Sequence, residues 1–103
     1  MDRPTSEGAV RFDWDEGNRE KCRAHGVSIA EIEELLSGSP LVAPDMKHSL
    51  NEQRFIAVGR NAVGRPLFVA FTLRRQENGL TIRPISARYM HNKEIARYES
   101  EGS

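Results

Sequence analysis

The stretch richest in chemically active side chains is residues 85–94, ISARYMHNKE. It contains Arg88, Tyr89, His91 and Lys93, directly after an apolar run. The reference pKa of histidine lies near neutrality, so an imidazole can take or give a proton there. Arginine and lysine bind phosphate, and a tyrosine ring can stack on a base. These residue types suit either an RNA-cleaving surface or a soluble helix start.

Cleaving RNA without a metal requires a base for the 2′-hydroxyl, an acid for the 5′-oxygen and cations for the extra phosphate charge. Arg88 ends a predicted strand beside the start of the last helix, where free N–H groups favour a phosphate. Arg65 begins the central strand and approaches this region if the register allows. Regular alternation predicts that Arg83 and Arg88 point to opposite faces of the sheet.

Several of these candidates have a structural alternative. His91 stands three residues before Glu94, the spacing of a capping box, so it can cap the last helix. Arg83 can pair with a carboxylate from the acidic half of the chain instead of a phosphate. Tyr98, three residues after Ile95, can pin the last helix to the sheet instead of stacking on a base.

No metal site or cofactor is predicted. The three histidines, His25, His48 and His91, are far apart and form no His-x-x-His or His-x-x-x-His pair. His48 with Glu52, and His91 with Glu94, stand about one helical turn apart, but two ligands do not make a metal site. The sequence also lacks a glycine-rich phosphate loop and a Gly-x-Ser-x-Gly nucleophile motif. Cys22 falls within a predicted helix and is expected to pack rather than attack.

Charge is divided unevenly along the chain. Residues 1–51 contain six Lys or Arg and ten Asp or Glu, a net charge of −4. Residues 52–103 contain nine and five, a net charge of +4, and eight of these nine basic residues are Arg. The basic half fits polyanion binding, or equally a set of solvated strand faces.

The length of 103 residues predicts one domain, over residues 10–99, with polar tails at residues 1–9 and 100–103. No apolar run approaches the roughly 20 residues of a membrane span, and the N-terminus has no signal-peptide core. The single cysteine fits a reducing compartment. We therefore expect a cytoplasmic protein without membrane contact.

Local patterns predict an α+β fold. A short strand over residues 10–14 precedes a helix that Asp15 caps, and Ser28 with Glu31 forms a capping box for a second helix. A short edge strand follows at residues 41–43. Three strands at 54–60, 66–73 and 80–86, with hairpin turns at 61–64 and 76–79, form an antiparallel sheet with helices against one face. The last helix starts near His91 and runs to about Tyr98.

The order of these motifs resembles the BrnT family, the toxin halves of type II toxin–antitoxin pairs. The resemblance is carried by Phe12-Asp13-Trp14-Asp15, Asn18, His25-Gly26-Val27-Ser28, Glu31, Arg54-Phe55-Ile56-Ala57-Val58-Gly59, Gly64-Arg65, Ile85-Ser86-Ala87-Arg88, Glu94 and Tyr98-Glu99. It spans residues 12–99.

The resemblance implies a RelE-like ribonuclease fold and a toxin that blocks translation by cleaving RNA. A cognate BrnA-like antitoxin with a DNA-binding domain would neutralise it, so DNA is contacted only through the antitoxin. The resemblance points to Arg65, Arg83 and Arg88 as catalytic residues. The residue types add His91 as a catalytic candidate and Lys93 and Tyr89 as RNA-binding candidates. Thr or Ser often stands at the His91 position in the family, which favours capping there. The alternative function is a non-catalytic module that scaffolds the antitoxin.

Overall fold

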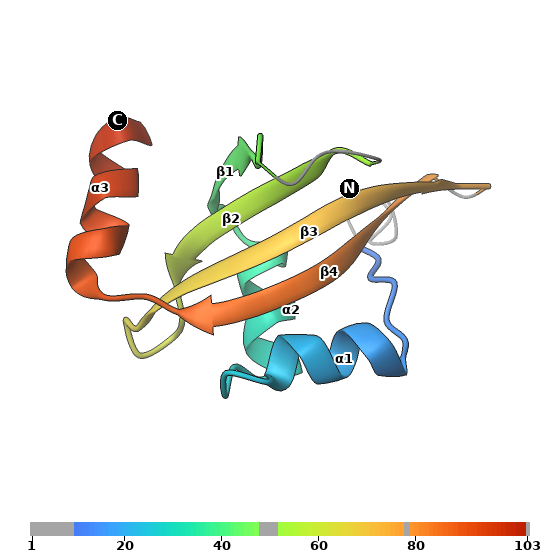
Figure 1. Cartoon of the computed structure of the whole chain (residues 1–103), viewed down its shortest axis with the longest axis horizontal. Helices are drawn as coiled ribbons and strands as arrows, with labels where there is room; N and C mark the ends of the chain where they lie inside the picture. Colours follow the sequence, from blue (N-terminus) through green and yellow to red (C-terminus); the bar gives the residue numbers. More distant parts are fainter. Residues whose placement is uncertain (1–9, 48–51, 78, 103) are drawn as a thin grey trace, which may run out of the picture.

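The computed structural model describes residues 10–47, 52–77 and 79–102. The elements described are α1 (Glu16–Arg23), α2 (Ile29–Ser37), β1 (Leu41–Pro44), β2 (Arg54–Arg60), β3 (Pro66–Gln76), β4 (Gly79–Tyr89) and α3 (Asn92–Gly102). The strands form one antiparallel sheet in the order β1-β2-β3-β4, so the predicted α+β class is confirmed (Figure 1). The predicted tail at residues 1–9 and His48 lie outside the described residues.

Local capping fixes where α1 and α2 begin. The N–H of Asn18 donates to Asp15 at 3.0 Å, and the N–H of Asp15 donates back to the Asn18 amide oxygen at 2.7 Å. Ser28 and Glu31 form the same reciprocal box at the start of α2. Between the helices, Gly26 has a φ of 88°, in the left-handed region that favours glycine. Both capping predictions are therefore confirmed.

The predicted strand over residues 10–14 is wrong. In the part of the chain that the structure describes, this segment forms one isolated bridge, in which Phe12 lies parallel to Ile82. The Asp13 N–H donates to the Ile82 carbonyl at 2.8 Å. The pairing cannot continue because Asp15 already caps α1. The bridge nevertheless holds Asp13 beside the edge of β4.

The apolar run at residues 68–71 lies inside the sheet, on β3 between β2 and β4, as predicted. The bounds of β2 match the prediction, but β3 continues to Gln76 and β4 spans Gly79–Tyr89. The added residues at the hairpin end are exposed and pair through their backbones, as Arg75 does with Leu80. Exposed residues that pair only through their backbones leave no hydrophobic alternation in the sequence, so the predicted strands were too short.

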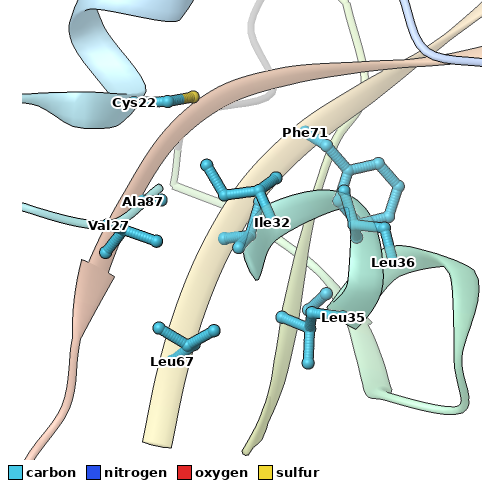
Figure 2. Packing of buried hydrophobic residues seen from close by; sticks show 10 residues of the cluster. Cys22, Val27, Ile32, Leu35, Leu36, Leu67, Phe71 and Ala87 are labelled. Atoms are coloured by element: carbon cyan, nitrogen blue, oxygen red, sulfur yellow. The ribbon is translucent and has the colours of Figure 1, made fainter. Parts of the chain in front are cut away.

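The main core fills the space between the sheet and the first two helices, and Figure 2 shows its side chains converging. Its buried members are Cys22, Val27, Ile32, Leu35, Leu36, Ala57, Leu67, Val69, Phe71 and Ala87. We call this side of the sheet the helical face. The opposite side, where α3 packs at one end, is the open face.

The helix α3 packs beside β1 and β2 at one end of the open face (Figure 1). Its Ile95 is fully buried in a second cluster with Val58. Because Val58 follows Ala57, which belongs to the main core, its side chain points to the opposite side. The prediction that the helices share one face is therefore wrong for α3. The helix also continues to Gly102 instead of ending near Tyr98.

Candidate functional site

Most of the predicted site residues gather at one end of the sheet. Leu67 pairs with Tyr89, and the Met90 N–H donates to the Pro66 carbonyl at 3.0 Å. Arg65 therefore lies across from the segment that joins β4 to α3. That segment and its two flanks contain the other four residues of the group, namely Arg88, Tyr89, His91 and Lys93.

Arg83 and Arg88 lie on the same face of the sheet, not on opposite faces as predicted. Their partners on β3 are Thr72 and Phe68, which are an even number of residues apart and so share a face. The prediction fails because β4 contains a β-bulge at Ile85. The extra residue shifts the alternation by one position and brings both arginines to the open face.

Arg83 is held by two carboxylates. Its Nη2 lies 2.9 Å from Oδ2 of Asp15, its Nη1 lies 3.5 Å from Oδ2 of Asp13, and its side chain is 20% exposed. Burial lowers the pKa of Arg83, but the bonds to Asp15 and Asp13 outweigh it and raise that pKa. The pKa of Asp15 is lowered, first by the Asn18 N–H and then by Arg83. Of the two sequence-based alternatives for Arg83, carboxylate pairing is the one that the structure contains.

Arg88 forms a bidentate ion pair with Glu94. Its Nη1 and Nη2 lie 3.1 and 2.8 Å from the two carboxylate oxygens, and its guanidinium carbon lies 4.5 Å from the Phe68 ring centroid. The bond to Glu94 raises the pKa of Arg88, and the same bond lowers the pKa of Glu94. Glu94 is thus ionised at neutral pH and orients Arg88. A guanidinium has more N–H donors than this pair uses, so some can bind a ligand.

His91 and Lys93 stand at the start of α3 with exposed side chains. The His91 carbonyl accepts the N–H groups of Glu94 at 3.0 Å and Ile95 at 3.2 Å. The pKa of Glu94 is lowered first by Arg88 and further by the backbone N–H of His91. The backbone of His91, and not its imidazole, thus contributes to the start of α3. The imidazole is exposed. A cation in a first helical turn opposes the helix dipole, so helix stability does not explain Lys93.

A network of polar side chains around Arg65 lies on the helical face at the same end of the sheet. The Arg65 guanidinium carbon stacks 3.5 Å from the centroid of the Tyr89 ring. The Tyr89 hydroxyl donates to Glu31, at 2.9 and 3.0 Å from its two oxygens. The Asn61 amide donates to Glu31 at 2.8 Å, and its oxygen accepts the Arg65 N–H at 2.8 Å. These four residues form one connected network.

Glu31 is the acceptor at the centre of this network. Partial burial raises the pKa of Glu31, but hydrogen bonds from Ser28, Asn61 and Tyr89 outweigh it and lower that pKa to about 2. The carboxylate is therefore charged at neutral pH. Because its oxygens already accept these bonds, we do not assign it a proton-transfer role.

Other chemistry finds little support in the described residues. Cys22 is fully buried, as predicted, and burial raises the pKa of its thiol to about 11. Within residues 10–47, 52–77 and 79–102, no three His, Cys, Asp or Glu side chains come together in a way that could hold a metal ion. Over the same ranges, no helix has the length and apolarity to cross a membrane.

The sequence analysis missed the role of Glu31 in the site. It identified this residue only as the capping partner of Ser28, three positions away. The bonds to Asn61 and Tyr89 span 30 and 58 residues, and no local pattern reports them. The turn around Asn61 was predicted, but its side chain could not be assigned an acceptor.

Comparison with known protein families identifies the family of this chain. Residues 14–94 match the profile of a family described as the ribonuclease toxin, BrnT, of type II toxin-antitoxin system. No curated protein sequence matches the chain. The matched residues include α1, α2, the whole sheet and the start of α3. They therefore contain all six predicted site residues, namely Arg65, Arg83, Arg88, Tyr89, His91 and Lys93. The resemblance seen in the sequence is confirmed: the chain belongs to the BrnT family of ribonuclease toxins of type II toxin–antitoxin systems.

Proposed function

We propose that the protein is an endoribonuclease toxin that cleaves RNA without a metal cofactor. Membership of the BrnT family carries this proposal. The cations gathered at one end of the sheet support it, because phosphoryl chemistry without a metal needs positive charge around the phosphate. In this proposal the toxin domain, residues 10–99, has a RelE-like fold, and its cleavage of cytoplasmic RNA stops translation.

His91 is the proposed proton-transfer residue, because its imidazole is exposed and histidine is the side chain that most often transfers protons in enzymes. Arg88 is the proposed ligand of the phosphate that gains charge. The side chains of Arg88 and Glu94 are 41% and 33% exposed. Both side chains reach solvent, so a phosphate can compete with Glu94 for the guanidinium of Arg88. Lys93 adds a second charge beside this position.

Arg83 enters the proposal as a further cation of the open face, at the other side of the bulge. A regular strand rises about 3.3 Å per residue, so its partner Thr72 lies about 13 Å along β3 from Phe68, the partner of Arg88. The two carboxylates beside Arg83 make it a weaker phosphate ligand than Arg88. We therefore propose that Arg83 contacts the RNA backbone away from the cleaved bond.

The cleavage test uses purified protein, single-stranded RNA and EDTA. We expect cleavage to persist in EDTA and to fall by about 100-fold or more in His91→Ala and Arg88→Ala, the usual scale for losing a proton-transfer or charge-stabilising group. Arg75→Ala is the matched control, because Arg75 is exposed at the far end of β3. Circular dichroism checks folding. Absence of cleavage by folded wild-type protein would reject the nuclease.

The proposed partner is a BrnA-like antitoxin, which neutralises the toxin and alone contacts DNA. A groove of 410 Å³ between β1 and α3 supports this part of the proposal. It is lined by Leu41, Val42, Ala43, Ile56, Val58, Tyr98 and Glu101. We propose that apolar side chains of the antitoxin enter the groove and that a basic residue beside them meets Glu101.

The second candidate is a module that binds the antitoxin and does not cleave RNA. The pairing of both Arg83 and Arg88 with carboxylates favours it, because neither arginine is free of an acidic neighbour. Controlled expression in a bacterial host separates the two functions. Growth arrest with RNA loss that Arg88→Ala relieves supports the nuclease. Normal growth, together with co-purification of the antitoxin, supports the module.

A further inference from the structure

Tyr89 is in the wrong place to stack on an RNA base. Its ring packs against the main core, and the Arg65 guanidinium lies 3.5 Å from the ring centroid. An incoming base would have to displace either the core or Arg65. The Tyr89 ring is therefore already covered by Arg65.

Arg65 is held by one backbone contact and one side-chain contact. Its backbone N–H donates to the Asn61 amide oxygen at 2.8 Å, and its guanidinium rests on Tyr89. The residue is exposed, and no carboxylate of the described residues forms an ion pair with it. Its N–H edge is therefore available to a ligand, whereas the guanidinium groups of Arg83 and Arg88 already donate to carboxylates.

The Tyr89 ring is itself held in place by Glu31. Glu31 accepts the Tyr89 hydroxyl with both oxygens, at 2.9 and 3.0 Å, and is held by Asn61 and the Ser28 N–H. This chain fixes the orientation of the ring. Donation from a phenol to a carboxylate also makes the ring more electron-rich, which strengthens its attraction for a guanidinium.

We propose that Arg65 is a preformed phosphate-binding residue for single-stranded RNA and that Tyr89 and Glu31 are its positioning residues. The inference rests on the proposed RNA substrate and assigns Tyr89 a role that differs from base stacking. A guanidinium that is already ordered and unpaired loses little conformational entropy on binding and displaces no carboxylate. Its planar N–H edge matches the geometry of a phosphate.

The test is a double-mutant cycle on the full-length protein. The probe is a fluorescent single-stranded 2′-O-methyl oligonucleotide, which lacks the 2′-hydroxyl needed for cleavage. We expect Arg65→Ala to weaken binding about tenfold and to reduce the salt dependence by about one phosphate contact. Tyr89→Leu should have the same effect alone. In the Arg65→Ala background it should have no further effect, because the ring acts through Arg65.

Conservative variants distinguish positioning from folding. Tyr89→Phe keeps the ring and removes the bond to Glu31, so binding should fall by less than in Tyr89→Leu while the salt dependence stays at the wild-type value. Glu31→Gln should behave in the same way. Arg75→Ala, the loss of an equal charge at the other end of β3, is the control and should leave affinity near wild type.

Three results would overturn the proposal. One is a further loss of affinity from Tyr89→Leu in the Arg65→Ala background, which would restore base stacking. The others are unchanged binding in Arg65→Ala and no binding of the probe by wild-type protein. Cleavage is scored separately: cleavage with unchanged binding in Arg65→Ala leaves the nuclease standing, and Arg65-dependent binding without cleavage rejects the nuclease alone.

Discussion

The Glu31 carboxylate accepts hydrogen bonds from three segments that are distant in sequence: the start of α2 at Ser28, the turn after β2 at Asn61, and the end of β4 at Tyr89. One side chain therefore connects these segments, and its bonds are stronger than those of a neutral acceptor because the carboxylate is charged. The same bonds hold its pKa at about 2, well below the ordinary value of 4.5.

This depressed pKa predicts a pH dependence of stability. A carboxyl whose pKa is lower in the folded state stabilises the fold above its unfolded pKa, and this contribution is lost as the pH falls toward the folded pKa. We expect the wild-type protein to lose stability between about pH 5 and pH 2, and Glu31→Gln to lose less over that range. Urea unfolding at several pH values measures this. Parallel curves for the two proteins would contradict it.

Cys22 gives a second prediction at this scale. The thiol is fully buried, and burial raises its pKa to about 11, so little thiolate exists at neutral pH. We expect a thiol reagent to label the native protein only at the rate of unfolding and to label it at once in urea. Labelling that is fast in buffer without urea would show that the cysteine is accessible in the native state.

At the scale of elements, Asn18 joins α1 to the edge of the sheet. It is 6% exposed, and its amide donates to the carbonyls of Pro84 at 2.8 Å and Asp13 at 3.0 Å. Its oxygen also accepts the Asp15 N–H. One buried side chain therefore completes a helix cap and satisfies two carbonyl groups of other segments.

Removing this amide should be costly. We expect Asn18→Ala to lower the free energy of unfolding by about 1–3 kcal/mol, because it leaves buried carbonyl groups without donors. Glu20→Ala is the control: this residue is exposed on the same helix and should change stability by less than about 0.5 kcal/mol. Urea midpoints measure both, and equal effects of the two variants would contradict the role given to Asn18.

Local features were predictable from the sequence for a physical reason. The capping boxes and the turn glycines Gly26 and Gly64, with φ values of 88° and 85°, depend on residues a few positions apart. The site depends on longer connections. The bond from Arg83 to Asp15 spans 68 residues, and the bulge at Ile85 is determined by pairing with β3. Most of the predicted residues thus gather at one end of the sheet, but the sequence did not identify which side chains they contact.

At the scale of the molecule, the proposed RNA-binding residues lie on both faces of the sheet, and the groove proposed for the antitoxin lies on the open face. The helical face contains the main core and the Arg65 network, whereas the open face carries Arg83, Arg88 and the apolar groove. In the proposed function, RNA and antitoxin therefore bind neighbouring regions of one small domain.

The groove between β1 and α3 leads to a prediction about antitoxin binding. We expect Leu41→Glu to weaken antitoxin binding by about tenfold or more, because Leu41 pairs with Val58 on the open face and the change places a charge without a partner in the apolar groove. Leu80→Glu is the matched control, because it adds the same charge at an exposed leucine of the hairpin between β3 and β4. Titration of each variant with purified antitoxin measures the difference. Equal losses in both variants would place the antitoxin elsewhere.

The bulge at Ile85 means that β4 contains one residue more than its pairing with β3 uses. A strand that slips by one residue exchanges its two faces. Because Pro84 pairs with Phe71 and Ser86 with Ala70, deleting Ile85 would leave both flanks in register and keep Arg88 and Tyr89 on their present faces. Among natural variants of this chain, a one-residue deletion at this position is therefore compatible with the site, whereas one that moves Arg88 out of its pairing with Phe68 is not.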